Sequence, residues 1–433
     1  MIDVAEIKYH GEQVGAVRWD EERLLGSFQY TPFWLHNGVE LAPLMMPLRQ
    51  GGRIYSFPDL RADRESEFDT FKGLPGLLAD ALPDKYGNEL IRLWLAQNGR
   101  ATGSMNPVEQ LCFIGSRGMG ALEFEPSVLG NMQRTFKVEL DGLVNYAAQM
   151  LQKRETFVTQ LNSEEEKAMK DILRIGTSAG GARPKAVISY NEKTGEVRSG
   201  QTHAAKGFSQ WIIKLDGVSD EQFGKSTGYG RVELAYAHMA TDAGIEMMAC
   251  RLLEENGRAH FMTRRFDRSP DGTKIHMQSW CALRHFDFNR VGYYSYEQLF
   301  ETMRMLRLSY PETAQMFRRM VFNILARNCD DHTKNFAFLM DETGKWKLAP
   351  AFDVCYAYRP NSYWVSRQSL SLRGKRENFS EEDFLRIASE VGVKKAPLIL
   401  AEIKNTISGW KKYAQEAGVS RELTHLVQKN LLV

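Results

Sequence analysis

The residue types between positions 330 and 353 suit the transfer of a phosphoryl group. Asp330 and Asn335 lie in one short polar stretch, and Asp353 follows after an apolar one. Phosphoryl transfer needs a carboxylate that orients or accepts the proton of the attacking hydroxyl. It also needs a carboxylate and an amide that hold Mg²⁺ against nucleotide phosphates. In the protein-kinase motif HRDxxxxN, the Asp and Asn have the spacing of Asp330 and Asn335. We therefore predict that these three residues form one catalytic and metal-binding trio.

Hydrophobic spacing predicts the elements that position this trio. Apolar residues at helical spacing predict a buried helix over 316–325, directly before the polar stretch. Two apolar runs within 336–350 predict a β-hairpin. If the hairpin turns about Gly344, Asn335 faces Asp353 across its open end. A solvated loop after a helix is the simpler explanation of the polar stretch, and the hairpin with its second Asp weighs against it.

Cationic residues upstream could meet the phosphates of a nucleotide. A glycine-rich stretch at 176–185 allows close approach of the backbone and ends in Lys185. The stretch matches neither GxGxxG nor a Walker A motif, so an ordinary turn explains it about as well. Lys214 lies in an apolar strand-like run and needs an anionic partner or a sheet edge. We predict that Lys214 contacts ATP phosphates and pairs with Glu233 on the following helix. An edge-strand lysine and an exposed helix glutamate are the simpler alternative.

Composition and charge indicate a folded protein with no dedicated polyanion-binding face. The chain has 433 residues, of which 43% are hydrophobic and 25% charged, and this excludes a disordered chain. There are 56 Lys and Arg against 54 Asp and Glu, a net charge of +2. The five cysteines show no C-x-x-C spacing, which argues against a zinc ribbon or a disulfide framework. Neither a signal peptide nor a membrane-spanning run is found, so we expect a soluble cytoplasmic protein that does not contact a membrane.

Strand-like and helical patterns predict the α+β fold class. Short apolar segments broken by turns fill the first part of the chain, further strands surround Lys185 and Lys214, and helical spacing dominates the last third. We divide the chain into an N-terminal β-rich subdomain (1–130), a nucleotide-binding part (131–290), and a helical lobe with the catalytic and metal-binding elements (291–433).

Together these stretches resemble the HipA family of bacterial serine/threonine kinases, the toxin components of type II toxin–antitoxin systems. The matching segments are LLADALPD at 77–84, SAGGARPK at 178–185, Lys214, RFDR at 265–268, DDHTKN at 330–335 and PAFD at 350–353. They occur in order along nearly the whole chain, and DDHTKN with its downstream Asp is the most specific. The resemblance implies a protein-kinase-like domain of two lobes, with an N-terminal β-rich subdomain, a large helical C-terminal lobe and ATP between the lobes.

The resemblance also implies roles for individual residues. Asp330 would be the catalytic base, and Asn335 with Asp353 would hold Mg²⁺. His332 would help to orient the loop. The ATP-binding residues would be Ala179, Gly180, Gly181, Ala182, Arg183, Lys185, Lys214, Arg264, Arg265, Phe266, His332, Lys334, Asn335 and Asp353. The segment from Arg264 to Phe266 would contact adenine through its backbone.

Members of the family silence themselves by phosphorylating a loop serine, which expels the loop. Ser178 occupies that position here, and Thr177 is the adjacent alternative. A phosphate on Ser178 would add about two negative charges beside phosphate-binding groups, so expulsion is physically reasonable. Where the best-known loop carries Gln-Glu before its lysine, this chain carries Arg183 and Pro184, and the proline would stiffen the loop.

The resemblance further implies macromolecular partners. A small helix-turn-helix antitoxin, similar to HipB, would neutralise the toxin and provide the contacts with operator DNA. The substrate would be a protein. In the best-known case it is the glutamate-specific aminoacyl-tRNA synthetase, whose phosphorylation halts translation and growth, and other members choose other synthetases. We find no helix-turn-helix in this chain, which fits such a division of roles.

Two other functions are compatible with the same residues. One is a kinase of similar fold that phosphorylates a small molecule. The other is a catalytically silent co-repressor that acts only with its antitoxin. The presence of the trio and of Lys214 argues against the silent protein, because a pseudokinase usually lacks at least one of these residues.

Several further segments have an ordinary structural explanation. We expect two basic clusters to be solvated surface: Arg264, Arg265 and Arg268, and Arg373, Lys375 and Arg376. The second cluster could alternatively grip nucleic acid. The aromatic segment 356–364 either binds substrate or packs under the helical lobe. Ser380 and Asp383 predict a helix-capping box.

Overall fold

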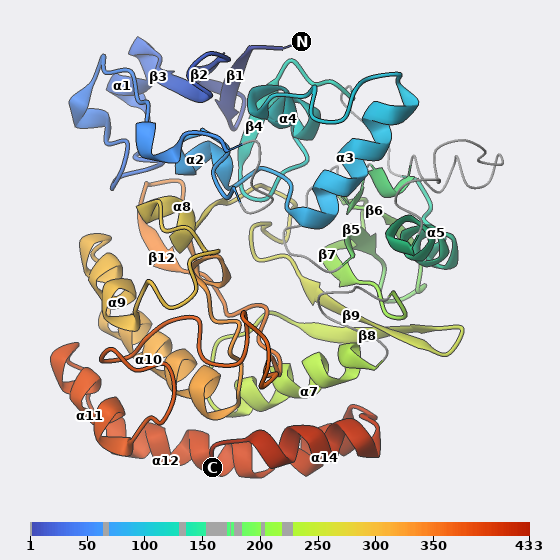
Figure 1. Ribbon diagram of the computed structural model, residues 1–433, viewed down its shortest axis with the longest axis vertical. Coiled ribbons are helices and arrows are strands. Elements are labelled where there is room, and N and C mark those ends of the chain that lie inside the picture. The colour runs from blue at the N-terminus through green and yellow to red at the C-terminus, as the bar shows by residue number, and fades with distance from the viewer. Residues whose placement is uncertain are drawn as a thin grey trace. The chain divides into compact units, whose positions relative to one another are not determined.

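The structure is a computed structural model that describes residues 2–63, 69–129, 136–152, 171–173, 175–176, 184–200, 204–218 and 228–433. The chain divides into two units. The first comprises Met1–Leu41, Met46–Gly230 and Arg251–Met277, and the second comprises Ala42–Met45, Arg231–Cys250 and Gln278–Val433. Both contain helices and strands (Figure 1), which confirms the predicted α+β class. The three-part domain division from the sequence stays a prediction.

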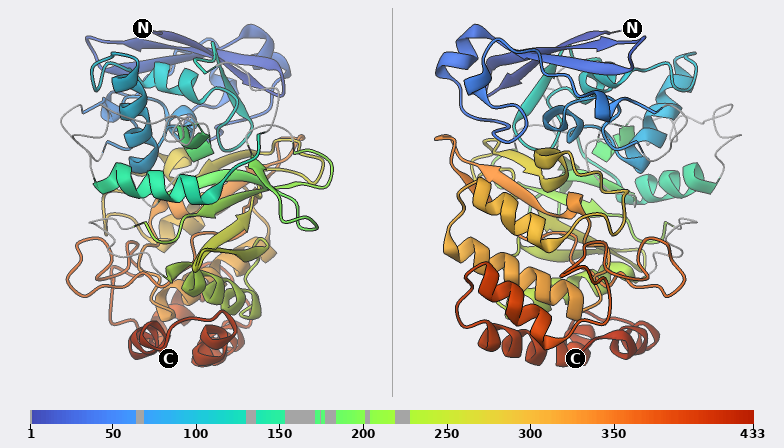
Figure 2. Two further views of the ribbon diagram at one scale, coloured as in Figure 1. Left: turned by 90° about the vertical axis from the view of Figure 1, so that its right-hand side faces the viewer. Right: turned by 60° about the vertical axis from the view of Figure 1, so that its left-hand side comes forward.

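An antiparallel sheet of four strands lies in the N-terminal part of the first unit. Its order is β3 (Leu25–Tyr30), β2 (Glu12–Asp20), β1 (Val4–Tyr9) and β4 (Leu122–Glu125). Alternate residues of β2, such as Val17 and Trp19, are buried, because side chains along a strand alternate between its two faces. Helix α4 (Pro107–Ile114) packs against this sheet (Figure 2). The remaining helices here are α1 (Pro32–Asn37), α2 (Gly76–Ala79) and α3 (Lys85–Gln97).

The second sheet of the first unit carries the two lysines predicted to bind phosphates. Its order is β6 (Val197–Ser199), β5 (Lys185–Tyr190), β7 (Ser209–Lys214), β9 (Arg258–Arg264) and β8 (Cys250–Glu255). Every residue of β5 is buried. Helix α5 (Leu140–Gln152) places Val144 in one hydrophobic core with Ile188 and Trp211 of the sheet. The strand ends that carry the lysines are therefore fixed by a well-packed core.

Helices dominate the second unit. They are α7 (Tyr229–Asp242), α8 (Trp280–Arg284), α9 (Tyr296–Met305), α10 (Tyr310–Leu325), α11 (Glu381–Glu390), α12 (Ala396–Ser408), α13 (Trp410–Glu416) and α14 (Arg421–Asn430). Helix α10 begins at a capping box formed by Ser309 and Glu312, and it buries Met316 and Met320. The prediction of a buried helix before the polar stretch is confirmed. Strand β10 (His276–Ser279) lies where the two units meet along the chain.

The predicted hairpin is present as β11 (Ala337–Met340) and β12 (Trp346–Leu348), but its turn differs from the prediction. Gly344 has a φ of 82° and takes the left-handed position at the end of the loop instead of the centre. The Asp341 carboxylate fixes this loop, because its Oδ1 accepts hydrogen bonds from the N–H groups of Thr343 at 2.9 Å and Lys345 at 3.0 Å.

This turn shifts the register of the hairpin. Phe338 pairs with Leu348. Extension of the same register places Asn335 opposite Ala351, so the predicted direct pairing of Asn335 with Asp353 is wrong. The physical reason is the Asp341 side chain, whose hydrogen bonds fix the conformation of the loop. The positions of glycine and proline alone do not reveal this conformation.

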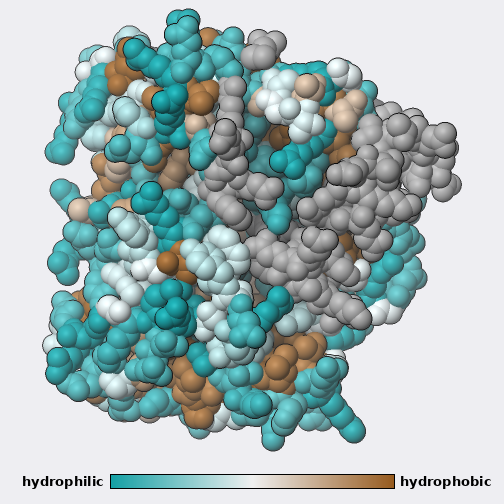
Figure 3. All heavy atoms as spheres, viewed as in Figure 1, coloured by the Kyte–Doolittle hydropathy of each residue, from teal (hydrophilic) through white to brown (hydrophobic). Residues whose placement is uncertain are grey.

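On the face drawn in Figure 3, hydrophilic side chains predominate among the residues described. Within that part of the chain, no helix is both long enough and apolar enough to cross a bilayer.

Candidate active site

The polar stretch predicted to be catalytic follows α10 directly. Arg327 adopts a left-handed φ of 58°, which turns the chain out of the helix. The N–H of Cys329 donates to the carbonyl of Ala357 at 3.1 Å, and the N–H of Ala357 donates to the carbonyl of Arg327 at 3.0 Å. The start of the loop is therefore held by the helix end on one side and by a distant segment on the other.

Asn335 closes this loop back onto Asp330. Its Nδ2 donates to the backbone carbonyl of Asp330 at 2.8 Å. This bond uses the donor end of the carboxamide, so the oxygen is the atom left to bind a cation. The Asp330 side chain is 40% exposed, and its carboxylate is open to an incoming hydroxyl. Two members of the predicted trio thus lie in one hydrogen-bonded loop.

Asp331 anchors the loop, and the sequence analysis gave it no role. Its carboxylate is buried and accepts hydrogen bonds from the Tyr296 hydroxyl at 2.6 Å, the Ser369 N–H at 2.7 Å and Gln368 Nε2 at 3.1 Å. These donors are neutral. Burial therefore dominates and raises the pKa of Asp331 to about 7. The doubled acidic residue in the DDHTKN segment was the available signal, but its partners come from remote segments.

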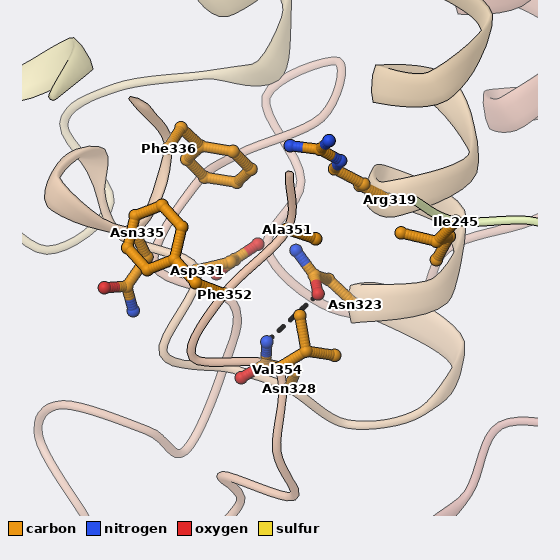
Figure 4. Close-up of a pocket in the computed structure, with 10 residues that line it drawn as sticks. All are labelled: Ile245, Arg319, Asn323, Asn328, Asp331, Asn335, Phe336, Ala351, Phe352 and Val354. Carbon is orange, nitrogen blue, oxygen red and sulfur yellow. Dashed lines mark hydrogen bonds between the residues drawn. The ribbon is translucent and has the colours of Figure 1, made fainter. Parts of the chain in front are cut away.

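The same polar network reaches back into α10. Asn323 Oδ1 accepts a hydrogen bond from Asn328 Nδ2 at 3.0 Å (Figure 4). Asn323 Nδ2 lies 3.4 Å from the hydroxyl of Tyr296, which holds Asp331. Gln368 Nε2 also donates to the carbonyl of Asn328 at 3.1 Å. Buried polar groups that satisfy one another in this way fix a single loop conformation.

Asp353 lies beyond β12 in a strained backbone conformation. Its φ is 52°, a left-handed value that residues other than glycine adopt infrequently. Such conformations concentrate at functional sites, where the surrounding structure must enforce them. The neighbours Phe352 and Val354 line the same pocket as Asn335 (Figure 4). The fold thus brings the Asp353 segment close to Asn335 through this pocket, although not through the predicted register.

The donor atoms of Asn335 and Asp353 suit Mg²⁺. Both offer hard oxygen ligands, and Mg²⁺ commonly takes one or two carboxylates together with water and substrate phosphates. Among the described residues, no group of three or more His, Cys, Asp and Glu side chains could hold a metal by itself. A metal at this position would therefore need further oxygen ligands, such as water or phosphate.

His332 and Lys334 pack on one aromatic ring. The His332 ring lies 5.2 Å from that of Phe288, and Lys334 Nζ lies 5.5 Å from the same ring centre. His332 Nε2 is 3.9 Å from a carboxylate oxygen of Asp330. The structure therefore places His332 where it can orient the loop. The predicted contact of both residues with ATP stays a prediction.

The two predicted phosphate-binding lysines lie directly opposite each other. Lys185 on β5 and Lys214 on β7 are register partners in antiparallel strands, so their side chains share one face of the sheet. Lys214 Nζ also lies 5.6 Å from the ring centre of Phe261 on β9. Two cations placed in this way could both face one anion bound on that side of the sheet. The other loop predictions, Thr177, Ser178, Ala179, Gly180, Gly181, Ala182 and Arg183, lie outside the described residues.

Glu233, the predicted partner of Lys214, lies on α7 within the second unit. It is 4% exposed, so the alternative of an exposed helix glutamate is wrong. A buried carboxylate requires a cationic or hydrogen-bonding partner. Its ion pair with Lys214 stays a prediction.

The basic cluster at the end of β9 is a buried ion-pair network. Arg265 Nε and Nη2 lie 2.8 and 2.7 Å from the two carboxylate oxygens of Asp267. Arg268 Nη1 and the Gly120 N–H also donate to Asp267, at 2.9 and 2.7 Å. The prediction of solvated side chains for Arg265 and Arg268 is wrong, because Asp267 gives both a buried counter-ion. Burial disfavours the carboxylate, but the two arginine charges outweigh it and hold the pKa of Asp267 well below its usual range.

The ion-pair network around Asp267 limits which atoms of residues 264–266 could contact a nucleotide. The Arg265 side chain is fully engaged, and its N–H donates to the carbonyl of Gln210 at 3.0 Å. A contact with adenine would have to use the backbone carbonyl, in keeping with the backbone role that the resemblance implies. Arg264, the register partner of Trp211, and Phe266 are only partly buried.

The other segments with structural explanations behave largely as predicted. Arg373 and Lys375 are exposed and pair with Glu390 at 2.6 Å and Asp383 at 2.8 Å, so these two are solvated surface. Arg376 departs from the prediction, because it is partly buried and its Nε donates to the carbonyl of Gln368 at 2.6 Å. The capping box of Ser380 and Asp383 is confirmed.

The aromatic segment 356–364 packs into the structure at its start, and its role in substrate binding stays a prediction. Tyr356 is buried, and its hydroxyl accepts a hydrogen bond from Asn430 at 3.0 Å. Tyr363 is 71% exposed. The start of the segment therefore packs within the second unit, and its end is available to a ligand.

Comparison with known protein families gives two matches that together span most of the chain. The family described as HipA-like C-terminal domain matches residues 177–410, and that described as HipA N-terminal domain matches residues 5–125. Two Sinorhizobium fredii proteins, Y4mE and Y4dM, both provisionally named kinases, are 25% identical over 205 residues and 26% identical over 189. These segments cover 44% and 41% of this chain. They cover only 42% and 44% of the two relatives, so the chain matches less than half of their length.

A solved structure shares the fold along the whole chain. The HipA protein of the Shewanella oneidensis MR-1 toxin–antitoxin system, solved with HipB and its operator DNA, matches 99% of this chain and 96% of its own. The TM-score is 0.63 and the sequence identity 16%. At this identity the similarity establishes the fold.

Proposed function

The chain belongs to the HipA family, and we propose that it is a serine/threonine protein kinase that uses ATP and Mg²⁺. The observation that supports this best is the closed loop in which Asn335 holds the backbone of the exposed Asp330. Asp331 fixes the same loop by accepting a hydrogen bond from the hydroxyl of Tyr296. The strained Asp353 lies on a segment that shares a pocket with Asn335. The kinase names of the relatives agree with this reaction class.

In this proposal each residue of the trio has a separate task. The exposed carboxylate of Asp330 accepts a hydrogen bond from the acceptor hydroxyl, orients it and takes its proton during attack. The oxygen of Asn335 and the carboxylate of Asp353 would hold the metal. Bound Mg²⁺ would neutralise charge on the phosphate oxygens. His332, fixed against Phe288, keeps the loop in place.

The nucleotide phosphates would meet Lys185 and Lys214. Two cations opposite each other on one sheet face form a site that favours a multiply charged anion. The backbone of residues 264–266 would contact adenine, and residues 179–183 would cover the phosphates. Phosphorylation of Ser178 or Thr177 would then silence the enzyme by charge repulsion.

We further infer that a small helix-turn-helix antitoxin binds this chain and recruits operator DNA. The support is the shared fold with a HipA protein solved with HipB and operator DNA. The protein substrate would be an aminoacyl-tRNA synthetase, as the family resemblance implies, and its phosphorylation would arrest translation. Size-exclusion chromatography with the co-expressed neighbouring gene product, followed by a gel shift on the upstream DNA, tests the partner. Elution of the two proteins apart would contradict it.

Mass spectrometry of the purified protein after incubation with ATP and Mg²⁺ tests the kinase activity. The wild type should acquire phosphate on Ser178 or Thr177. Asp330→Asn should lose at least about 100-fold in rate, because general-base catalysis contributes roughly that factor. Glu342→Gln removes an exposed carboxylate at the hairpin tip and should behave as the wild type. Equal labelling of wild type and Asp330→Asn would refute the assignment of Asp330. Transfer only to a small molecule would support the other kinase class.

A further inference from the structure

A small pocket beside the catalytic loop contains a buried arginine with an unpaired edge. Arg319 lies on α10 and is 5% exposed. Its Nε and Nη2 have no hydrogen-bond partner among the described residues. Burial lowers the pKa of Arg319 to about 10, so the guanidinium still carries its charge at neutral pH. A buried charge without a partner is strongly unfavourable, so this group calls for a counter-charge.

The pocket around Arg319 is formed entirely by the second unit. Asn323 and Asn328 supply polar walls, and Ile245 and Phe336 supply apolar ones. In Figure 4, Arg319 and Asn335 lie on opposite sides of the pocket. The unpaired guanidinium therefore lies apart from the predicted Mg²⁺ ligand.

The Nε and Nη2 atoms of an arginine prefer to bind two oxygens of one oxyanion, and Arg265 of this protein is an example. Arg265 uses the same two atoms, Nε and Nη2, to grip both oxygens of Asp267 at 2.8 and 2.7 Å. That side-on geometry is specific for planar or tetrahedral oxyanions. In Arg319 the equivalent edge lacks its oxyanion. We propose that the Arg319 pocket is a binding site for a small oxyanion, a carboxylate or a phosphate.

Neither nearby acidic residue fills this role in the structure. Glu246 attracts the guanidinium electrostatically, but it is exposed and forms no ion pair with Arg319 within the described residues. Its backbone is fixed, since its carbonyl accepts a hydrogen bond from the Ala351 N–H at 2.8 Å. The Asp331 carboxylate also lines the pocket, but it is occupied by its own donors, including Tyr296. Within the described residues, the Nε and Nη2 atoms of Arg319 therefore have no acidic partner.

An oxyanion in this pocket would connect α10 to both functional loops. Asn328 belongs to the catalytic loop, and Phe352 and Val354 flank the strained Asp353. Binding would stabilise the unit and hold these loops in one conformation. This inference does not depend on the proposed kinase activity, because it concerns binding and stability in the absence of nucleotide.

Thermal unfolding of the full chain, titrated with inorganic phosphate or with acetate at constant ionic strength, tests the proposal. The wild type should show a saturable rise in unfolding temperature with at least one of the two anions. Arg319→Lys retains the charge but lacks the two-pronged edge, so binding should weaken about tenfold or more. Arg319→Met should abolish the response to acetate and weaken the response to phosphate, which Lys185 and Lys214 could still attract. Arg304→Met removes an exposed arginine of α9 and should keep the wild-type response.

Two further variants separate this site from its alternatives. Lys214→Met should keep the saturable response. If Lys214→Met lost the response to anions while Arg319→Lys kept it, the anion would bind at the lysine site. That result would overturn the proposal. If neither anion raised the unfolding temperature of the wild type, the proposal would also be overturned. A lower unfolding temperature of Glu246→Gln would then identify Glu246 as the partner of Arg319 in solution. A response to phosphate alone or to acetate alone would support the site and identify the class of its ligand.

Discussion

Replacement of Asp267 by asparagine should destabilise the first unit more than any other single loss of a carboxylate there. Asp267 is fully buried and accepts hydrogen bonds from Arg265, Arg268 and the backbone of Gly120. Asparagine keeps the size of the side chain and removes its charge. The two guanidinium groups would then remain buried without a counter-ion, with side chains only 1% and 7% exposed.

The expected magnitude follows from this burial. Removal of one partner of a buried ion pair costs about 3–5 kcal/mol, far more than the net value of an exposed pair. Since 1.4 kcal/mol corresponds to a factor of ten, the population of opened molecules should rise roughly 100- to several-thousand-fold. The Gly120 amide, which donates to Asp267 at 2.7 Å, should exchange its hydrogen faster by a similar factor.

Hydrogen exchange followed by mass spectrometry measures this locally, and urea unfolding measures it for the unit. Asp59→Asn is the matched control, because it makes the same chemical change at an exposed position and should alter stability by less than about 0.5 kcal/mol. A free energy of unfolding for Asp267→Asn within about 1 kcal/mol of the wild type would refute the reasoning. It would mean that the buried arginines do not depend on Asp267.

The pH dependence gives the same prediction a second test. The pKa of Asp267 lies well below its usual range in the folded state, so the folded chain holds the ionised form more firmly than the unfolded chain does. Its contribution is complete above the unfolded pKa of about 3.9 and is lost as the pH falls below that value. The difference between wild type and Asp267→Asn should therefore shrink in acid. A constant difference down to about pH 2 would contradict this linkage.

Three further substitutions give separate tests. Tyr296→Phe removes the hydroxyl that donates to the buried Asp331 at 2.6 Å, and it should lower the free energy of urea unfolding by about 1–3 kcal/mol. Tyr363→Phe, at an exposed position, should have almost no effect. Equal urea midpoints for the two variants would contradict the anchoring role of Tyr296. Burial lowers the pKa of His276 to about 4, so its stabilising neutral form is complete above about pH 6.5 and is lost as the pH falls towards 4. His276→Gln should flatten the stability profile in that range, and an unchanged slope would show that His276 does not titrate there. Lys214→Met should weaken ATP binding, measured by calorimetry, about tenfold or more, and unchanged affinity would remove Lys214 from the proposed site.

The closed loop of Asp330 and Asn335 could be predicted from the sequence because its contacts are local. Asp330 and Asn335 belong to one short segment, and the bond that joins them closes within it. Helix α10 was equally predictable, because its apolar residues recur with the helical period over several turns. In both cases, neighbours along the chain determine the structure.

The hairpin register was not predictable from the same information. The presence of Gly344 indicates a turn, but glycine can occupy the centre of a loop or its left-handed end. The choice depends on hydrogen bonds that Asp341 makes with the N–H groups of Thr343 and Lys345. A shift of the turn by one position moves every cross-strand partner, so the position of Asp353 had to come from the three-dimensional structure.

The partners of buried charges were the least predictable feature. Arg265 and Arg268 flank Asp267 in the sequence, and this alternation of charge was a usable signal that the prediction of a solvated surface ignored. The partners of Asp331 gave no such signal, because Tyr296 and Gln368 are brought to it only by tertiary packing. Sequence spacing shows which residues can react, whereas burial decides which of them need support.

Asp267, Asp331 and Arg319 are buried ionisable groups with three different surroundings, and the contrast explains their pKa values. Asp267 has full counter-charges, and its pKa falls despite burial. Asp331 has only neutral donors, and its pKa rises to about 7. Arg319 has no partner on the edge that Arg265 uses for Asp267, and its pKa falls to about 10. The first arrangement is complete within the chain and is structural, and the second holds the loop of Asp330 and Asn335 at the expense of stability. The third lacks a partner among the described residues, and an oxyanion bound there, as proposed above, would stabilise the protein.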